Sequence, residues 1–284
     1  MRTQTAEQFG VCSWSLQATG PHDLAEKVNR LGLKRVQLGL TPHRDDPGTW
    51  EGVEEILGDS GIAIVSGMFS TLGEDYSTPA TIRQTGGVVL DELWAENWAM
   101  AKAAGATAKA MGLKQVSTHA GFLPHDPKDP SFDKLSQRVA DLAGVFAENG
   151  AALLLETGQE TAETLLLFLE EMQQRGAQNV GVNFDPANMI LYDMGDPIGA
   201  LRELAPHVQQ VHVKDGKRTA VKGQWGEEVV VGTGEVDWVS FVRILGAADF
   251  GGSYVMEREA GDDRVGDIAQ GMRAVSAAMQ EVAG

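Results

Sequence analysis

Short apolar segments alternate with longer amphipathic ones along the whole chain. Eight segments have the pattern of strands, because branched and aromatic residues dominate them and Gly, Pro or polar residues bound them; they cover residues 9–14, 35–40, 62–69, 115–119, 151–156, 180–185, 208–213 and 253–257. Helical spacing of apolar positions follows over residues 21–31, 50–60, 90–104, 161–175, 197–205, 237–246 and 263–282, with a further helix from about residue 131. This alternation predicts a parallel sheet wrapped by helices.

The number of repeats decides between two parallel architectures. Eight β/α units without a break in composition predict an α/β fold, a single (β/α)8 TIM barrel over residues 1–284, which is an architecture of about 250 residues. The rival, an open doubly wound sheet, carries a glycine-rich phosphate loop after its first strand. Residues 12–16 are CSWSL instead, so the closed barrel is favoured.

Charge and cysteine content restrict the partners and the compartment. The chain has 23 basic and 40 acidic side chains, which give a formal net charge of −17. Such a surface repels phosphate backbones and anionic lipid, so we expect neither nucleic acid nor a membrane as partner. Cys12 is the single cysteine, and neither a signal segment nor an apolar run of about 18 residues is present. A cytoplasmic protein is predicted.

The last four predicted strands each carry a metal-ligand side chain at or near the C-terminal end: Glu156, Asp185, His212 and Glu257. Taken singly, each has an ordinary explanation, such as a helix cap, a turn, an ion pair or a core histidine. Four in succession favour convergence, because the C-terminal ends of barrel strands meet at one face. Three carboxylates and one imidazole suit one divalent metal ion, Mn or alternatively Mg, Co or Zn.

Five motifs extend from the first predicted strand to the last. They are FGVCSWS at residues 9–15, NFDPAN at 183–188, HVKD at 212–215, GTGEVDW at 232–238 and EREAG at 257–261. Together they resemble the xylose isomerase-like barrel superfamily, in particular the sugar phosphate isomerases and epimerases. The resemblance implies that Glu156, Asp185, His212 and Glu257 hold the metal, and that Glu156 and Glu257 also act as an acid/base pair.

The resemblance implies a metal-dependent sugar isomerase or epimerase. A cation chelated by a substrate carbonyl and the adjacent hydroxyl acidifies the C–H between them and stabilises an enediolate. Glu156 and Glu257 would then move a proton on a keto or aldose sugar or a polyol. The same groups could instead serve a lyase or dehydratase acting on a keto-inositol or 3-keto-glycoside. A DNA repair enzyme resembling AP endonucleases fits poorly with the negative charge, and the full ligand set argues against a non-catalytic sugar-binding protein.

Further residues near the strand ends are candidates for substrate binding: Trp14, Phe69, His119, Asn188, Lys214 and Arg218. Trp14 and Phe69 could stack on a sugar or belong to the top of the core. Lys214 could contact substrate or pair with Asp215. Asn188 stands where the sugar epimerases place a histidine, and an amide cannot titrate near neutral pH.

The other candidates also have structural alternatives. His119 ends the fourth predicted strand and faces the cavity, unless it packs behind the ligands. Arg218 lies near a substrate-binding arginine of these relatives, although a basic loop residue is often merely solvated. Glu259 replaces Glu257 as ligand if the strand register shifts by two residues.

Two long segments at the same end of the barrel are predicted to shape the pocket. Residues 223–234 combine glycines with alternating valines and predict a small hairpin over the cavity. Residues 71–87 form either a pocket wall or an oligomer contact. A homo-oligomer is a further expectation for a barrel with exposed helical faces, and the need for a partner subunit stays open.

Overall fold

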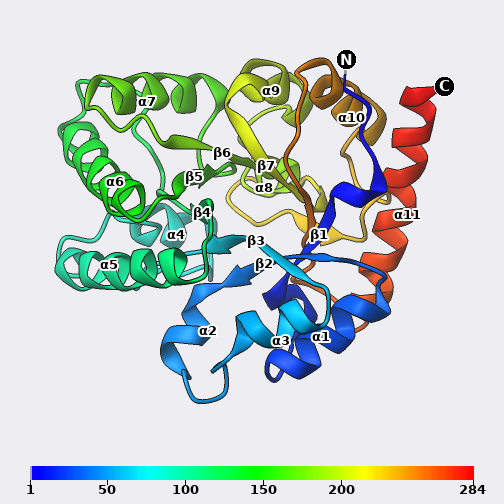
Figure 1. Ribbon diagram of the computed structural model, residues 1–284. Helices are drawn as coiled ribbons and strands as arrows, with labels where there is room; N and C mark the ends of the chain where they lie inside the picture. The colour runs from blue at the N-terminus through cyan, green and yellow to red at the C-terminus, as the bar shows by residue number, and fades with distance from the viewer. Residues whose placement is uncertain (1) are drawn as a thin grey trace.

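Eight parallel strands close into a barrel in the computed structural model, which describes residues 2–284 (Figure 1). The strands are β1 (Phe9–Cys12), β2 (Arg35–Gly39), β3 (Ala63–Met68), β4 (Gln115–Thr118), β5 (Ala152–Glu156), β6 (Val180–Phe184), β7 (Val208–Val213) and β10 (Tyr254–Met256). β1 closes the ring, because it pairs in parallel with both β2 and β10. The predicted (β/α)8 barrel is confirmed.

Each barrel strand is followed by a helix on the outside of the ring (Figure 1). These helices are α1 (Pro21–Arg30), α3 (Val53–Asp59), α5 (Trp94–Ala110), α6 (Pro130–Glu148), α7 (Ala162–Gln174), α9 (Pro197–Leu204), α10 (Trp238–Ala247) and α11 (Arg264–Ala283). Shorter helices lie in three connections and are α2 (Leu40–Asp45), α4 (Pro79–Thr85) and α8 (Pro186–Leu191). Single 3-10 turns cover Ala6–Gln8, Ser13–Leu16 and Ala205–His207.

Capping side chains determine where several helices begin. The Asp129 carboxylate accepts a hydrogen bond from the Ser131 backbone N–H at 2.8 Å, next to the first turn of α6. Thr161, Asp237 and Asp263 cap α7, α10 and α11 in the same manner. The predicted starts of these helices are confirmed to within one residue.

The helix predicted over residues 90–104 begins later than its apolar stripe. α5 starts at Trp94, so Leu90 and Leu93 precede it. Both leucines contact the loop at Gly73, where an added Cβ would lie 2.7 Å from Leu90 and 2.5 Å from Leu93. They hold the 71–87 segment against the barrel instead of continuing the helix.

An antiparallel hairpin extends the chain beyond β7. Its strands are β8 (Asp215–Lys217) and β9 (Glu227–Val229). The prediction that the hairpin lies wholly within residues 223–234 is corrected, because its first strand directly follows β7. The buried Asp215 carboxylate holds the base of the hairpin by accepting hydrogen bonds of 2.9–3.2 Å from the backbone N–H groups of Gly216, Gly232, Gly234 and Val236 and from the Trp238 indole.

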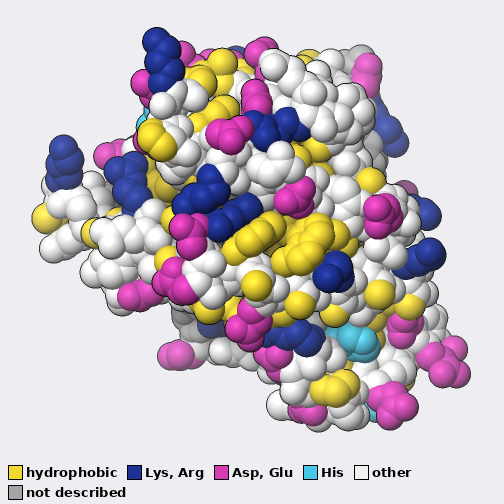
Figure 2. Space-filling view, turned by 90° about the vertical axis from the view of Figure 1, so that its left-hand side faces the viewer, with side chains coloured by type: hydrophobic (Ala, Val, Ile, Leu, Met, Phe, Trp, Pro, Cys, Tyr) yellow, Lys and Arg dark blue, Asp and Glu magenta, His cyan; other side chains and the backbone are white. Residues whose placement is uncertain are grey.

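The outer face over α5, α6 and α7 carries interspersed acidic and basic side chains (Figures 1 and 2). Arg175 pairs there with Asp133 and Glu171, and Lys134 pairs with Asp91. Within residues 2–284 we find no helix that is both long and apolar enough to cross a membrane.

Candidate active site

Four side chains meet at the C-terminal face of the barrel. Glu156 ends β5, Asp185 follows β6, His212 lies in β7 and Glu257 follows β10. Each contributes one potential ligand atom, and these four atoms all lie within 4.8 Å of one another. His212 Nδ1 is 3.3 Å from Glu156 Oε1 and 3.2 Å from Glu257 Oε2. The predicted convergence is thus present, while ligation itself stays a prediction.

Unpartnered polar atoms in this cluster fit a divalent cation. Asp185 Oδ2, His212 Nδ1 and Glu257 Oε2 are buried and have no hydrogen-bond partner among the described residues. Burying such atoms without a partner is costly. Because all three face the same small space, one cation would satisfy them together, and three oxygens with one nitrogen suit the ions predicted above.

Electrostatics within the cluster favour added positive charge. Burial raises the pKa of Asp185 well above its usual range, and the neighbouring Glu257 and Glu156 add to that rise against the opposing effect of Lys214. Burial acts to lower the pKa of His212, but Glu156 and Glu257 outweigh it and hold that pKa well above normal. Without a metal, protons compensate the excess of carboxylate charge, so a divalent ion would compete with them.

Gln37 of β2 orients the imidazole of His212. Gln37 Nε2 donates to the Gly67 carbonyl, which leaves Oε1 facing His212 Nε2 at 2.7 Å. Because an amide oxygen can only accept, this contact places a proton on Nε2, while Asn183 Nδ2, 3.0 Å from the same nitrogen, donates to Glu156 Oε2. On losing its other proton, His212 would present the Nδ1 lone pair to a cation. Sequence reasoning missed Gln37, although a glutamine within the apolar strand β2 is a signal that the sequence shows.

The two glutamates have different neighbours. Glu156 Oε1 accepts from Asn188 Nδ2 at 3.0 Å, and its Oε2 accepts from Asn183 Nδ2 at 3.1 Å. Glu257 Oε1 accepts from the Trp14 indole at 2.8 Å, while its Oε2 lies 3.2 Å from Lys214 Nζ. One carboxylate is therefore oriented by two amides, and the other by an indole and an ammonium group.

These neighbours also determine the charge states of the pair. Burial acts to raise the pKa of Glu257, but Lys214 and His212 outweigh it and hold that pKa well below its usual range. For Glu156 burial is likewise outweighed, by His212 and then His119, so its pKa is lowered as well. Both carboxylates are ionised at neutral pH, as metal ligands and general bases must be.

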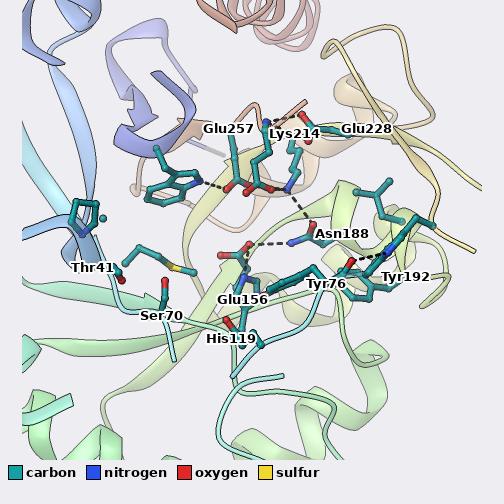
Figure 3. Close-up of a pocket in the computed structure, with 18 residues that line it drawn as sticks. Thr41, Ser70, Tyr76, His119, Glu156, Asn188, Tyr192, Lys214, Glu228 and Glu257 are labelled. Atoms are coloured by element: carbon teal, nitrogen blue, oxygen red, sulfur yellow. Dashed lines mark hydrogen bonds and ion pairs between the residues drawn. The ribbon is translucent and has the colours of Figure 1, made fainter. Parts of the chain in front are cut away.

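A cavity of about 570 Å³ lies above this cluster (Figure 3). Glu156 and Glu257 point into it from different strands, with β6 and β7 between those strands in the ring (Figure 3). Four of the predicted substrate-binding residues also line it, namely Trp14, His119, Asn188 and Lys214. His119 Nε2 lies 3.9 Å from Glu156 Oε1. A site of this size suits a small molecule of the dimensions of a sugar.

The structure places two predicted substrate contacts elsewhere. Phe69 is only 3% exposed and its ring packs at 6.2 Å from that of Phe146, so it belongs to the apolar core outside the cavity. Arg218, an exposed residue directly after β8, forms an ion pair with Asp193 at 2.5 Å and does not line the cavity. Burial in the core removes Phe69 from the pocket, and the pairing with Asp193 directs Arg218 away from it.

The alternative in which Lys214 pairs with Asp215 is wrong. Its ammonium group lies 2.6 Å from Glu259 Oε2 and 3.2 Å from Glu257 Oε2. Glu259 is therefore a partner of Lys214, and Glu257 is the carboxylate that joins the ligand cluster. Asp215 is instead occupied by the N–H groups at the base of the hairpin.

Two long connections build the cavity walls. Glu74 and Tyr76 come from the 71–87 segment, so the predicted pocket wall is present. Trp225 and Glu228 come from the hairpin. The Trp225 indole donates to the Tyr76 carbonyl oxygen at 3.2 Å, which joins the two connections at the cavity wall. Sequence reasoning named both segments but not these residues, because their pairing is a long-range contact.

Comparison with known proteins agrees with this geometry. Residues 25–278 match the family model described as xylose isomerase-like TIM barrel. The chain belongs to this family. A xylose isomerase domain protein from Planctomyces limnophilus shares 31% identity, with 91% of this chain and 92% of that chain covered, and superimposes with a TM-score of 0.82. No curated protein gives a significant match to the sequence.

Two more distant xylose isomerase-like structures share the fold. One is a xylose isomerase-like TIM barrel protein from Mycobacterium smegmatis in complex with magnesium, at 18% identity, a TM-score of 0.72 and coverage of 99% and 100% of the two chains. The other is L-ribulose 3-epimerase, at 15% identity, a TM-score of 0.72 and coverage of 97% and 95%.

Proposed function

We propose that this family member is a divalent-metal-dependent isomerase or epimerase acting on a keto or aldose sugar or a polyol. The observation that carries the proposal is the convergence of four potential ligand atoms, three of them buried and unpartnered, at the base of a cavity of about 570 Å³. The similarity to an L-ribulose 3-epimerase and to a magnesium complex supports it at the level of the fold.

Glu156, Asp185, His212 and Glu257 would hold the ion. When bound, a divalent ion would polarise a substrate carbonyl and lower the pKa of the neighbouring C–H. Glu156 and Glu257 reach the cavity from separated strands, so a substrate between them presents one face to each carboxylate. One glutamate would remove the proton, and the other would return a proton to the opposite face or to the adjacent carbon.

The side chains around Glu156 and Glu257 support these two roles. Lys214, 3.2 Å from Glu257 Oε2, holds that carboxylate ionised and ready to accept a proton. Asn188 donates to Glu156 and so fixes its direction, but the amide itself transfers no proton. Trp14 orients Glu257 through its indole N–H and also lines the cavity, where its ring can cover the apolar face of a sugar.

Proton exchange from solvent tests the proposal. The Mn-loaded protein is incubated in D₂O with a panel of free keto sugars, keto-inositols and 3-keto-glycosides, and NMR follows the carbon next to the carbonyl. We expect deuterium incorporation with isomerisation or epimerisation. Loss of a leaving group would show a lyase instead, and no exchange across the panel would contradict the proposal.

Matched variants separate chemistry from folding. Glu156→Gln and Glu257→Gln are each expected to lower exchange by at least about a hundredfold, as removal of a general base does. Glu163→Gln makes the same charge change on the exposed first turn of α7 and should leave exchange unchanged. Equal activity in all three variants would rule out the proposed acid/base pair.

A further inference from the structure

The proposed sugar site carries a marked excess of acidic side chains. Glutamates line the cavity at five positions, which are Glu74, Glu156, Glu228, Glu257 and Glu259. Among the described residues that line it, Lys214 is the one lysine or arginine. A phosphorylated or carboxylated substrate would need a free cation here, so the state of Lys214 determines whether such a substrate can bind.

The Lys214 ammonium group already has its hydrogen-bond partners within the protein. Nζ donates to Glu259 Oε2 at 2.6 Å and to Asn188 Oδ1 at 3.4 Å, and it lies 3.2 Å from Glu257 Oε2. Two of its three N–H groups therefore have hydrogen-bond acceptors, and the Glu257 carboxylate balances its charge at ion-pair distance. The lysine is 4% exposed, so an incoming anion would have to displace one of these partners.

Glu259 is the partner that faces the cavity entrance. Its side chain is 53% exposed, whereas that of Glu257 is 5% exposed. The backbone N–H of Glu259 donates to Glu228 Oε1 at 3.0 Å, and Arg258 Nη1 donates to the same oxygen at 2.8 Å. Glu228 of β9 thereby fixes the loop after β10, and with it the position of the Glu259 carboxylate over Lys214.

The formal charges of the lining residues give the net charge that a bound anion would experience in the cavity. Three ligand carboxylates are balanced by one divalent ion and by Lys214, so the base of the cavity is close to neutral. Glu74, Glu228 and Glu259 then remain at the walls, where Arg258 compensates only one of them. Neutral hydroxyl groups can accept or donate to these carboxylates, but a phosphate or carboxylate is repelled by them.

We propose that Glu259 is a specificity-determining residue that occupies Lys214 and restricts this site to uncharged polyhydroxylated substrates. The proposal rests on the function proposed above for its substrate class, but the occupation of Lys214 is a property of the protein itself. Replacing Glu259 by glutamine removes the charge nearest the entrance and loosens the hold on Lys214, while the ligand set stays intact.

The test measures the binding of an inorganic anion, a neutral sugar and the phosphate ester of that sugar. Isothermal titration measures sulfate, D-fructose and D-fructose 6-phosphate against the Mg-loaded wild type, Glu259→Gln and Glu227→Gln. Glu227 is an exposed residue of β9 outside the cavity, so E227Q makes the same change in net charge. We expect E259Q to bind sulfate and the sugar phosphate more tightly by up to about fivefold, the range of a partly exposed charge pair. E227Q should match the wild type.

Two results would overturn the proposal. One is sulfate affinity in E259Q no higher than in the wild type and E227Q. The other is a wild type that binds D-fructose 6-phosphate more tightly than D-fructose. The sulfate comparison needs no turnover, so it can succeed where the exchange assay fails, and active exchange with unchanged sulfate affinity would contradict this inference alone.

Discussion

Replacing Asp215 by asparagine should destabilise the protein at the base of its hairpin. The buried carboxylate accepts five hydrogen bonds, two at Oδ1 and three at Oδ2. In Asp215→Asn one oxygen becomes an NH₂ group, so at least two of these N–H donors lose their acceptor in either orientation. At roughly 1.5 kcal/mol for each buried donor left unpaired, we expect a loss of about 3 kcal/mol in the free energy of unfolding.

Urea unfolding measures this loss, and hydrogen exchange locates it. The midpoint should fall at an unchanged m-value, and the amides of residues 215–238 should exchange faster than those of the barrel strands. Asp133→Asn is the matched control, because Asp133 pairs with Arg175 at a side-chain exposure of 85%. If D215N is destabilised no more than D133N, the anchoring role assigned to Asp215 is incorrect.

Two further predictions concern buried polar groups. Gln37→Leu should weaken Mn²⁺ affinity by about tenfold or more, because His212 loses the acceptor that fixes its tautomer, and Gln37→Glu should restore part of that affinity. Equal affinities of the wild type and both variants in isothermal titration would refute the role of Gln37. Burial raises the pKa of Glu160 to about 8, so the folded protein keeps a proton that the unfolded chain releases near the ordinary pKa of a glutamate. The free energy of unfolding therefore falls as the pH rises from the unfolded-state pKa to the folded-state pKa. Glu160→Gln should therefore raise the free energy of unfolding by up to about 5 kcal/mol above the raised pKa and change it little below the unfolded pKa. Denaturation curves showing the same difference at both pH values would contradict this.

The barrel and its ligand cluster were predictable because they follow local patterns. Strand-like runs ending in Glu156, Asp185, His212 and Glu257 can be recognised within a few residues of sequence, and parallel pairing then determines where their ends meet. Helix caps such as Asp129 are equally local, because the side chain bonds a backbone N–H two residues away.

The cavity walls depend on contacts between distant segments, which local patterns do not specify. Tyr76 and Trp225 lie 149 residues apart in sequence and meet through one hydrogen bond. Phe69 and Trp14 have similar aromatic patterns near strand ends, yet only Trp14 lines the cavity, because Phe69 turns toward Phe146. The direction of an aromatic side chain at a strand end is set by its neighbours in space.

Metal titration tests the central claim most directly. Chelator-treated protein is titrated with Mn²⁺ by calorimetry, and bound metal is then counted by elemental analysis for the wild type, His212→Ala and the surface control Glu163→Gln. We predict one ion per chain in the wild type and in E163Q, a thermal midpoint that rises with Mn²⁺ concentration, and loss of both in H212A. A wild type without saturable binding, or an H212A variant that binds as the wild type does, would contradict the account.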